Sequence, residues 1–92
     1  MKRIENKIAI ITGGADGIGK AASIRFAQEG ATVIIWDMNE EKGKATVDEI
    51  KKNGGNAEFV KVNTAKYEEV EAATKDTIDK YARIDILINN AG

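Results

Sequence analysis

The chain has 92 residues, 42% of them hydrophobic and 32% charged, which is typical of one small folded domain or of part of a larger one. Its 14 basic and 15 acidic residues, with a net charge of −1, are spread along the chain, so nucleic acid and anionic membranes are not favoured as partners. Because cysteine and histidine are both absent, thiol catalysis, disulfides, a Ser-His-Asp triad and the usual zinc or copper ligands are excluded.

No membrane span or targeting segment is predicted near the start of the chain. An apolar run as short as residues 8–11 cannot cross a bilayer. Residues 1–6 carry positive charge, but no long apolar stretch follows them, as one would in a signal peptide. We therefore expect a cytoplasmic protein.

The first two elements are a strand and a helix. Residues 7–12 form a continuous apolar run that stops at glycines, which is typical of a strand buried on both faces of a parallel sheet. Residues 17–29 follow with helical spacing, and Gly30 can end that helix. The residues predicted for its buried face are Ile18, Ala22 and Phe26.

The same alternation continues to the end of the chain. Residues 32–36 are a second β-branched run, after which Asn39 can cap a helix that ends at residues 53–55. Strands are predicted over 57–62 and 84–88, with a helix over 66–81 between them. The predicted inner stripes of the second and third helices are Gly43, Val47 and Ile50, and Val70, Ala73, Thr77, Ile78 and Tyr81.

The order β-α-β-α-β-α-β predicts an α/β fold, because strands that alternate with single helices build a parallel, doubly wound sheet. No linker or low-complexity segment interrupts the pattern, and there is no proline in the chain. We therefore expect regular elements joined by short turns, with ligand-binding residues in the turns that follow the strands.

A glycine-rich turn joins the first strand to the first helix. Gly13 permits a tight turn, Gly17 lets the backbone approach a pyrophosphate, and Gly19 allows close packing of the helix. The free N–H groups of the helix N-terminus would then face the anion. The alternative is a glycine-rich loop without a ligand, although the position between a strand and a helix favours a dinucleotide site.

The turn also partly matches the phosphate loop of NTPases. Residues 14–20 fit the pattern G-x-x-x-x-G-K, but that loop requires a serine or threonine next, to ligate magnesium, and Ala21 stands there. A phosphate-loop NTPase is therefore the weaker alternative.

Asp37 ends the second predicted strand and follows Gly17 by 20 positions. A carboxylate there can accept hydrogen bonds from both hydroxyls of an adenosine ribose, and it would repel a 2′-phosphate. Asp16 adds a second negative charge inside the turn, and Met38, next to Asp37 in the predicted site, is not basic. We expect NAD(H) to be preferred over NADP(H), although Asp37 could also be an ordinary turn residue.

The pattern T-G-x-x-x-G-x-G over residues 12–19, Asp37, and N-N-A-G at residues 89–92 together resemble the short-chain dehydrogenase/reductase family. The resemblance covers the whole chain, and 3-oxoacyl-acyl-carrier-protein reductases look most similar among its members. It implies a Rossmann-type sheet with strand order 3-2-1-4, and an NAD(P)-dependent oxidoreductase that reduces a carbonyl or oxidises an alcohol.

The resemblance also implies cofactor-binding roles for individual residues. The backbone of Ala15 and Ile18 would lie near the pyrophosphate, and Asn63 and Thr64 occupy the positions of an Asp-Val pair that contacts adenine in the family. Asn63 could accept from the adenine amino group through its amide oxygen. The stretch beside the adenosine ribose would be Asn90, Ala91 and Gly92, whereas Asn89 would be structural.

The catalytic residues of the family have no counterpart here. The family uses a serine, an asparagine and a Tyr-x-x-x-Lys pair, but Glu71 and Asp85 stand four positions after Tyr67 and Tyr81. The resemblance therefore implies that residues 1–92 are the N-terminal cofactor-binding half-domain of a longer enzyme, inactive alone. The alternative is a stand-alone dinucleotide-binding or interaction module. With an uncovered sheet edge and face, the chain is expected to form a homo-oligomer or a poorly stable monomer.

Overall fold

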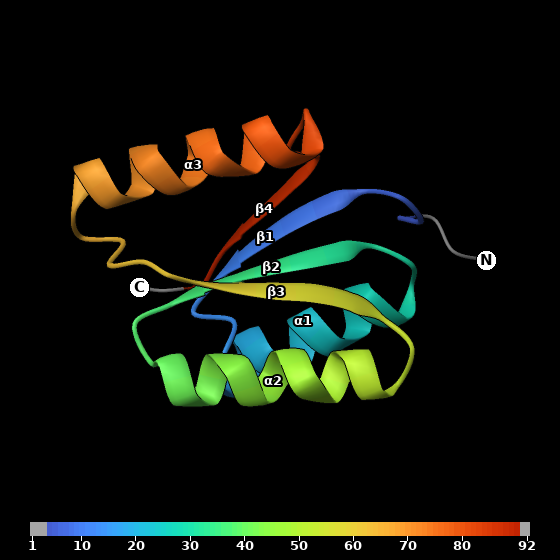
Figure 1. Cartoon of the computed structure of the whole chain (residues 1–92). Coiled ribbons are helices and arrows are strands. Elements are labelled where there is room, and N and C mark those ends of the chain that lie inside the picture. Colours follow the sequence, from blue (N-terminus) through green and yellow to red (C-terminus); the bar gives the residue numbers. More distant parts are fainter. Residues whose placement is uncertain (1–3, 91–92) are drawn as a thin grey trace.

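Four strands and three helices alternate along residues 4–90, which are the residues that the computed structural model describes (Figure 1). The elements are β1 (Ile8–Thr12), α1 (Gly17–Gln28), β2 (Thr32–Asp37), α2 (Glu40–Lys52), β3 (Asn56–Lys61), α3 (Tyr67–Tyr81) and β4 (Ile86–Asn89). All strand pairs are parallel and the order is β3-β2-β1-β4, which confirms the predicted fold class and strand order.

The central strand β1 is buried along its whole length because both faces of the sheet are covered. Figure 1 shows α1 and α2 on one face and α3 on the other. Ile11 and Ile35 face α1 and α2, whereas Ile10 and Ile34 face α3, and all four side chains are buried. Since every strand is parallel, the turns after β1, β2 and β3 lie at one edge of the sheet, which positions the candidate site.

The buried face of α1 differs from the prediction. The buried residues are Gly19, Ser23 and Ala27, one position after the predicted stripe, and Ile18 is 81% exposed. Small side chains at these positions allow α1 to lie close to the sheet. Of the predicted stripe, Ala22 and Phe26 are half-buried and pack against the core, so only Ile18 was predicted wrongly. On α3, Ala73 and Thr77 are buried as predicted, but Ile78 is 46% exposed. The predicted inner stripe of α2 is confirmed.

The fourth strand begins at Ile86, two residues later than predicted. Asp85 explains the difference, because its carboxylate accepts a hydrogen bond from the Ile8 N–H at 2.8 Å. Its own N–H donates to the Ile8 carbonyl at 2.9 Å, so Asp85 anchors the start of β1 before the regular ladder begins. That hydrogen bond, together with the neighbouring Arg83 guanidinium, lowers the pKa of the Asp85 carboxyl.

Gly43 is where α2 packs against β3. A Cβ atom there would lie 2.2 Å from Cδ1 of the Phe59 ring, so Gly43→Ala forces this ring to move. We expect urea unfolding to show a loss of about 1 kcal/mol, because overpacking outweighs the better helix propensity of alanine. The double variant Gly43→Ala with Phe59→Leu should recover part of the loss. Unchanged stability of Gly43→Ala would contradict this packing.

Candidate functional site: a dinucleotide cradle at the carboxyl edge of the sheet

The site is built around the turn between β1 and α1. Gly13 leaves β1 with φ +66° and donates its N–H to the Trp36 carbonyl at 2.8 Å, which ties the turn to β2. Gly17 has φ +55°, and a Cβ atom there would meet nothing within 4 Å, so the turn is open to solvent at this point. The backbone can therefore be approached closely by a ligand.

Gly19 is enclosed, in contrast to Gly17. A Cβ atom at Gly19 would lie 2.0 Å from the Gly13 carbonyl oxygen and 2.7 Å from Nδ2 of Asn90. The first turn of α1 therefore rests directly on the glycine turn, whereas the sequence had indicated close packing on the strand. No side chain fits between them.

The N-terminus of α1 presents free donors. Asp16 caps the helix, its carboxylate accepting the Gly17 N–H at 2.9 Å. Within the described part of the chain, the N–H groups of Ile18 and Gly19 have no acceptor. Such donors, with the positive end of the helix dipole, form a general anion site, and the pyrophosphate of a dinucleotide fits that chemistry.

Asp37 lies beside the glycine turn, as its spacing predicted. One oxygen of its carboxylate accepts the Ala15 N–H at 3.2 Å, and the other accepts the Asn39 N–H at 2.9 Å. These two bonds fix the carboxylate at the carboxyl end of β2, half-buried, with acceptor positions left for a ligand.

A hollow of about 160 Å³ lies next to Asp37. It brings together predicted site residues from the turns after three strands, and it also includes Trp36 and Val62, which were not predicted as site residues. Its lining residues are Gly13, Trp36, Asp37, Met38, Val62, Asn63 and Thr64. A planar, partly apolar group such as adenine suits this lining. The Trp36 indole is buried, and its Nε1 has no hydrogen-bond partner among the described residues.

Asn63 already makes hydrogen bonds within the turn that follows β3. Its amide oxygen accepts the Ala65 N–H at 3.0 Å, and its backbone N–H donates to the Glu69 carboxylate at 2.8 Å. The oxygen expected to meet an adenine amino group thus already has one partner, which leaves one lone pair for a ligand. Thr64 is exposed and also lines the hollow.

The end of β4 supports the glycine turn. Asn89 contacts the Thr12 hydroxyl through its amide oxygen at 3.0 Å, in keeping with the structural role expected for it. Asn90 donates its backbone N–H to the Thr12 hydroxyl at 2.9 Å and its Nδ2 to the Gly13 carbonyl at 3.3 Å. Asn90 therefore holds the turn in place. Ala91 and Gly92 lie outside the described residues.

Two residues of α2 that were not predicted from the sequence also contact the glycine turn. The buried Thr46 hydroxyl lies 3.2 Å from the Ala15 carbonyl, and Lys42 Nζ lies 2.9 Å from the Asp16 carboxylate. The capping role of Asp16 could have been recognised from its place before a helix, but its pairing with Lys42 is a tertiary contact with no local signal.

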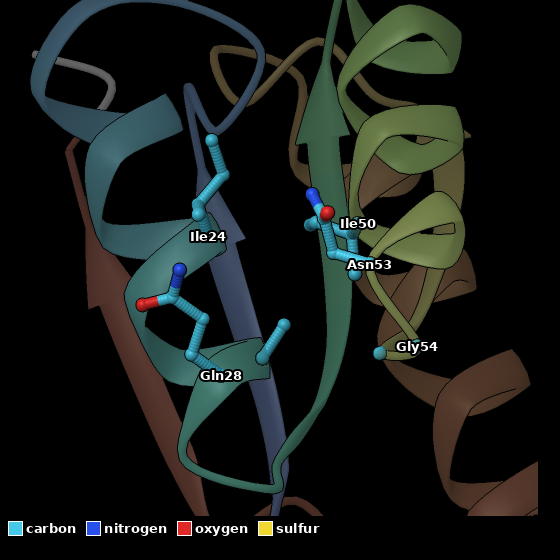
Figure 2. Close-up of a pocket in the computed structure, with 7 residues that line it drawn as sticks. Ile24, Gln28, Ile50, Asn53 and Gly54 are labelled. Carbon is cyan, nitrogen blue, oxygen red and sulfur yellow. The ribbon is translucent and has the colours of Figure 1, made fainter.

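The hollow in Figure 2 lies away from these groups, between the C-terminal parts of α1 and α2. It measures about 110 Å³, and Figure 2 shows Ile24 and Gln28 on one side and Ile50 and Asn53 on the other. Asn53 Nδ2 is already bonded to the Glu49 carbonyl. No charged group lines it, so its chemistry does not match that of the glycine turn.

Comparison with known proteins identifies the family to which this chain belongs. Residues 7–92 match the family model described as short chain dehydrogenase. The chain belongs to the short-chain dehydrogenase family. An uncharacterized oxidoreductase from Thermotoga maritima is 48% identical over 96% of this chain and 34% of its own length. The 3-oxoacyl-[acyl-carrier-protein] reductase of the same organism is 41% identical over 98% of this chain and 37% of its own.

Solved structures of short-chain dehydrogenases agree. A 7α-hydroxysteroid dehydrogenase complexed with NADH and 7-oxo glycochenodeoxycholic acid superimposes with a TM-score of 0.94 and 41% identity, over 99% of this chain and 36% of that chain. This short-chain dehydrogenase chain therefore spans about a third of the length of the relatives it matches. Membership of the family argues against a phosphate-loop NTPase, as does Lys20, whose ammonium lies 3.6 Å from the Glu49 carboxylate on α2.

No helix within residues 4–90 is both long enough and apolar enough to cross a membrane.

Proposed function

We propose that this chain is the NAD(H)-binding portion of an oxidoreductase that interconverts a carbonyl and an alcohol. The observation that carries the proposal is the placement of two features on one glycine turn, namely the free N–H groups at the start of α1 and the carboxylate of Asp37, which is fixed to the turn and borders the hollow. The first suits a pyrophosphate and the second a ribose diol. Residues Gly13, Ala15, Ile18 and Asn90 would hold or frame the cofactor in this arrangement.

A bound nicotinamide would supply the hydride, and no residue of this chain is assigned to the proton transfer. The Tyr67 hydroxyl contacts Glu71 at 3.3 Å, and the Tyr81 hydroxyl contacts Glu58 at 2.9 Å, where burial and this carboxylate raise the pKa of the tyrosine. Lys80 lies beside Tyr81, but its ammonium is paired with the same Glu58 oxygen at 2.6 Å, and the net effect on the pKa of Tyr81 is still a rise. We therefore expect this chain to bind NADH without oxidising it. For the oxidoreductase of which it would be a portion, we propose 3-oxoacyl thioesters as one possible substrate class.

The proposed preference for NADH rests on charge. Asp37 and Asp16 place two carboxylates close to the glycine turn, where a 2′-phosphate would meet them. An adenosine ribose with free hydroxyls would instead donate to Asp37. This argument supports NAD(H) over NADP(H).

The test is a titration of the chain with NADH, NADPH and ATP, followed through Trp36 fluorescence. The indole lines the hollow and is the only tryptophan, so an occupied site should quench it or receive its excitation energy. We expect a saturable response to NADH at concentrations at least about tenfold below those for NADPH, since like charges about 4 Å apart near a protein surface repel by more than about 1 kcal/mol. Equal affinities for the two dinucleotides would contradict the preference, and a response to ATP alone would contradict the function.

We also propose that the chain associates with itself through the outer face of α3. Tyr67, Ile78 and the nearby strand residue Leu87 are 73%, 46% and 60% exposed, and an apolar hollow runs along the helix. Glu71 and Lys75 border this hollow one helical turn apart, so an antiparallel second copy would place each beside its opposite charge.

Sedimentation at increasing concentration tests this association. Ile78→Lys is expected to shift the chain to a monomer, because it places a charge in the centre of the apolar face. Ala45→Lys is the matched control, since Ala45 is exposed on α2 at the other face of the sheet. A native chain that is monomeric at every concentration would contradict the proposal, and so would equal behaviour of the two variants.

A further inference from the structure

Lys42 occupies an unusual position for a cation. It lies in the first turn of α2, where the helix dipole disfavours positive charge, directly after Glu40 and Glu41. Its ammonium extends out of α2 to the glycine turn, where Nζ lies 2.9 Å from the Asp16 carboxylate. Asp16 in turn caps α1, so this one ion pair joins the N-termini of both helices at the candidate site.

The ammonium of Lys42 is also within electrostatic reach of Asp37. The hydrogen bond and charge of Asp16 raise the pKa of Lys42 most, and the Asp37 and Glu41 carboxylates add to the rise. The Lys42 side chain is more than half exposed, as is that of Asp16. A flexible four-carbon stem can therefore move its charge between Asp16 and any anion bound beside Asp37.

The backbone around this ion pair is fixed by other contacts. The Ala15 N–H donates to the Asp37 carboxylate at 3.2 Å, and the buried Thr46 hydroxyl lies between the Ala15 carbonyl at 3.2 Å and the Lys42 carbonyl at 3.0 Å. Asn39 caps α2 by accepting the Lys42 N–H at 3.0 Å. Because these bonds hold the turn and the helix without the ion pair, the charges of Asp16 and Lys42 can be altered separately from the shape of the site.

We propose that the Asp16–Lys42 ion pair helps to determine cofactor specificity. Asp16 binds the Lys42 ammonium and thereby prevents it from binding a phosphate on the ribose 2′-oxygen. The inference rests on the proposed dinucleotide site and deepens it by naming a second determinant of cofactor choice besides Asp37. With the pair formed, two carboxylates and one ammonium leave a net negative charge facing that phosphate. With Asp16 neutral, Lys42 has no competing partner there and is drawn to the phosphate.

Asp16→Asn tests this directly, because asparagine is an equally good helix cap and removes only the charge. At low ionic strength, the dissociation constant for NADPH should fall about tenfold, the usual effect of one new charge-assisted hydrogen bond. The constant for NADH should fall less, because NADH has no 2′-phosphate for Lys42 to contact, and the ratio of the two constants is therefore the quantity to measure. The gain for NADPH should shrink as salt is raised, because both side chains are exposed.

The double variant Asp16→Asn with Lys42→Met separates this account from a simple loss of repulsion. If Lys42 is responsible, the double variant loses the gain for NADPH. Glu49→Gln is the matched control, since it removes one negative charge and the other ion pair between α1 and α2, the Lys20–Glu49 pair at 3.6 Å. It should leave both dissociation constants unchanged.

The outcomes are distinguishable. A native chain that binds NADH, combined with an Asp16→Asn variant that gains nothing for NADPH, would overturn this inference and leave the proposed function standing. An equal gain with and without Lys42 would also overturn it. A native chain with no saturable response to NADH would overturn both.

Discussion

Gly19→Ala is expected to abolish the fluorescence response to NADH and to lower the free energy of unfolding by about 1–3 kcal/mol, the usual range for overpacking. The added Cβ would lie 2.0 Å from the Gly13 carbonyl oxygen, an atom of the backbone that cannot rotate away. Either α1 or the glycine turn must shift, and the Ile18 and Gly19 N–H groups would then no longer face the anion. The measurements are urea unfolding and the NADH titration.

Gly17→Ala is the matched comparison for that variant. A Cβ atom at Gly17 meets no neighbour, but φ is +55°, so the substitution adds only backbone strain of about 1–2 kcal/mol. We expect Gly17→Ala to keep the fold, and any weakening of NADH binding to come from the methyl group in the open approach to the turn. A Gly19→Ala chain with native stability and native NADH affinity would contradict the enclosed position of Gly19.

The second large effect is expected at Asp37. Asp37→Asn should weaken NADH binding about tenfold or more, because a hydrogen bond to a charged group contributes about 1.5–3 kcal/mol. The affinity for NADPH should change less, since the repulsion of its phosphate is removed at the same time. The amide also cannot accept both the Ala15 and the Asn39 N–H groups, which loosens the turn. The ratio of the two dissociation constants is the quantity to measure.

Asp48→Asn is the control for charge, because it also removes one negative charge, at a residue that is exposed on α2. It should leave the ratio unchanged. If Asp37→Asn kept the native ratio of NADH to NADPH affinity, Asp37 would have no part in cofactor choice, and the site would have to be assigned to other residues.

The strands and the topology could be predicted because they depend on local patterns. Apolar runs such as residues 8–11 have few places to lie except inside a sheet, and single helices between them leave few parallel topologies. Asp37 and the glycines could be predicted for a similar reason, since their spacing along the chain fixes their place at the carboxyl edge. Asn39 was correctly predicted as a cap from its side chain.

The errors have a common physical cause. The buried face of α1 is set by how closely the helix approaches the sheet, so Gly19, Ser23 and Ala27 are buried while Ile18 is exposed. The start of β4 depends on a side chain, Asp85, that bonds across 77 positions of sequence. Contacts of this kind are made by the assembled fold and leave no periodic signal.

The same holds for the part of the candidate site that was missed. Lys42 and Thr46 read as ordinary helix residues, and only the packing of α2 against the glycine turn gives them a role. Asn90 was predicted to lie beside the ribose, whereas its bonds to Thr12 and Gly13 support the turn itself. A role toward the cofactor stays a prediction for all of these residues.

Mapping the NADH site by nuclear magnetic resonance tests the central claim most directly. In a chain of 92 residues the backbone amides can be followed one by one during a titration. We predict saturable shifts at Ala15, Ile18, Asp37, Thr64 and Asn90, at the carboxyl edge of the sheet, with little change around the hollow of Figure 2 or on the outer face of α3. Shifts confined to either of those regions, or no shifts with NADH, would contradict the assignment of this edge as a dinucleotide site.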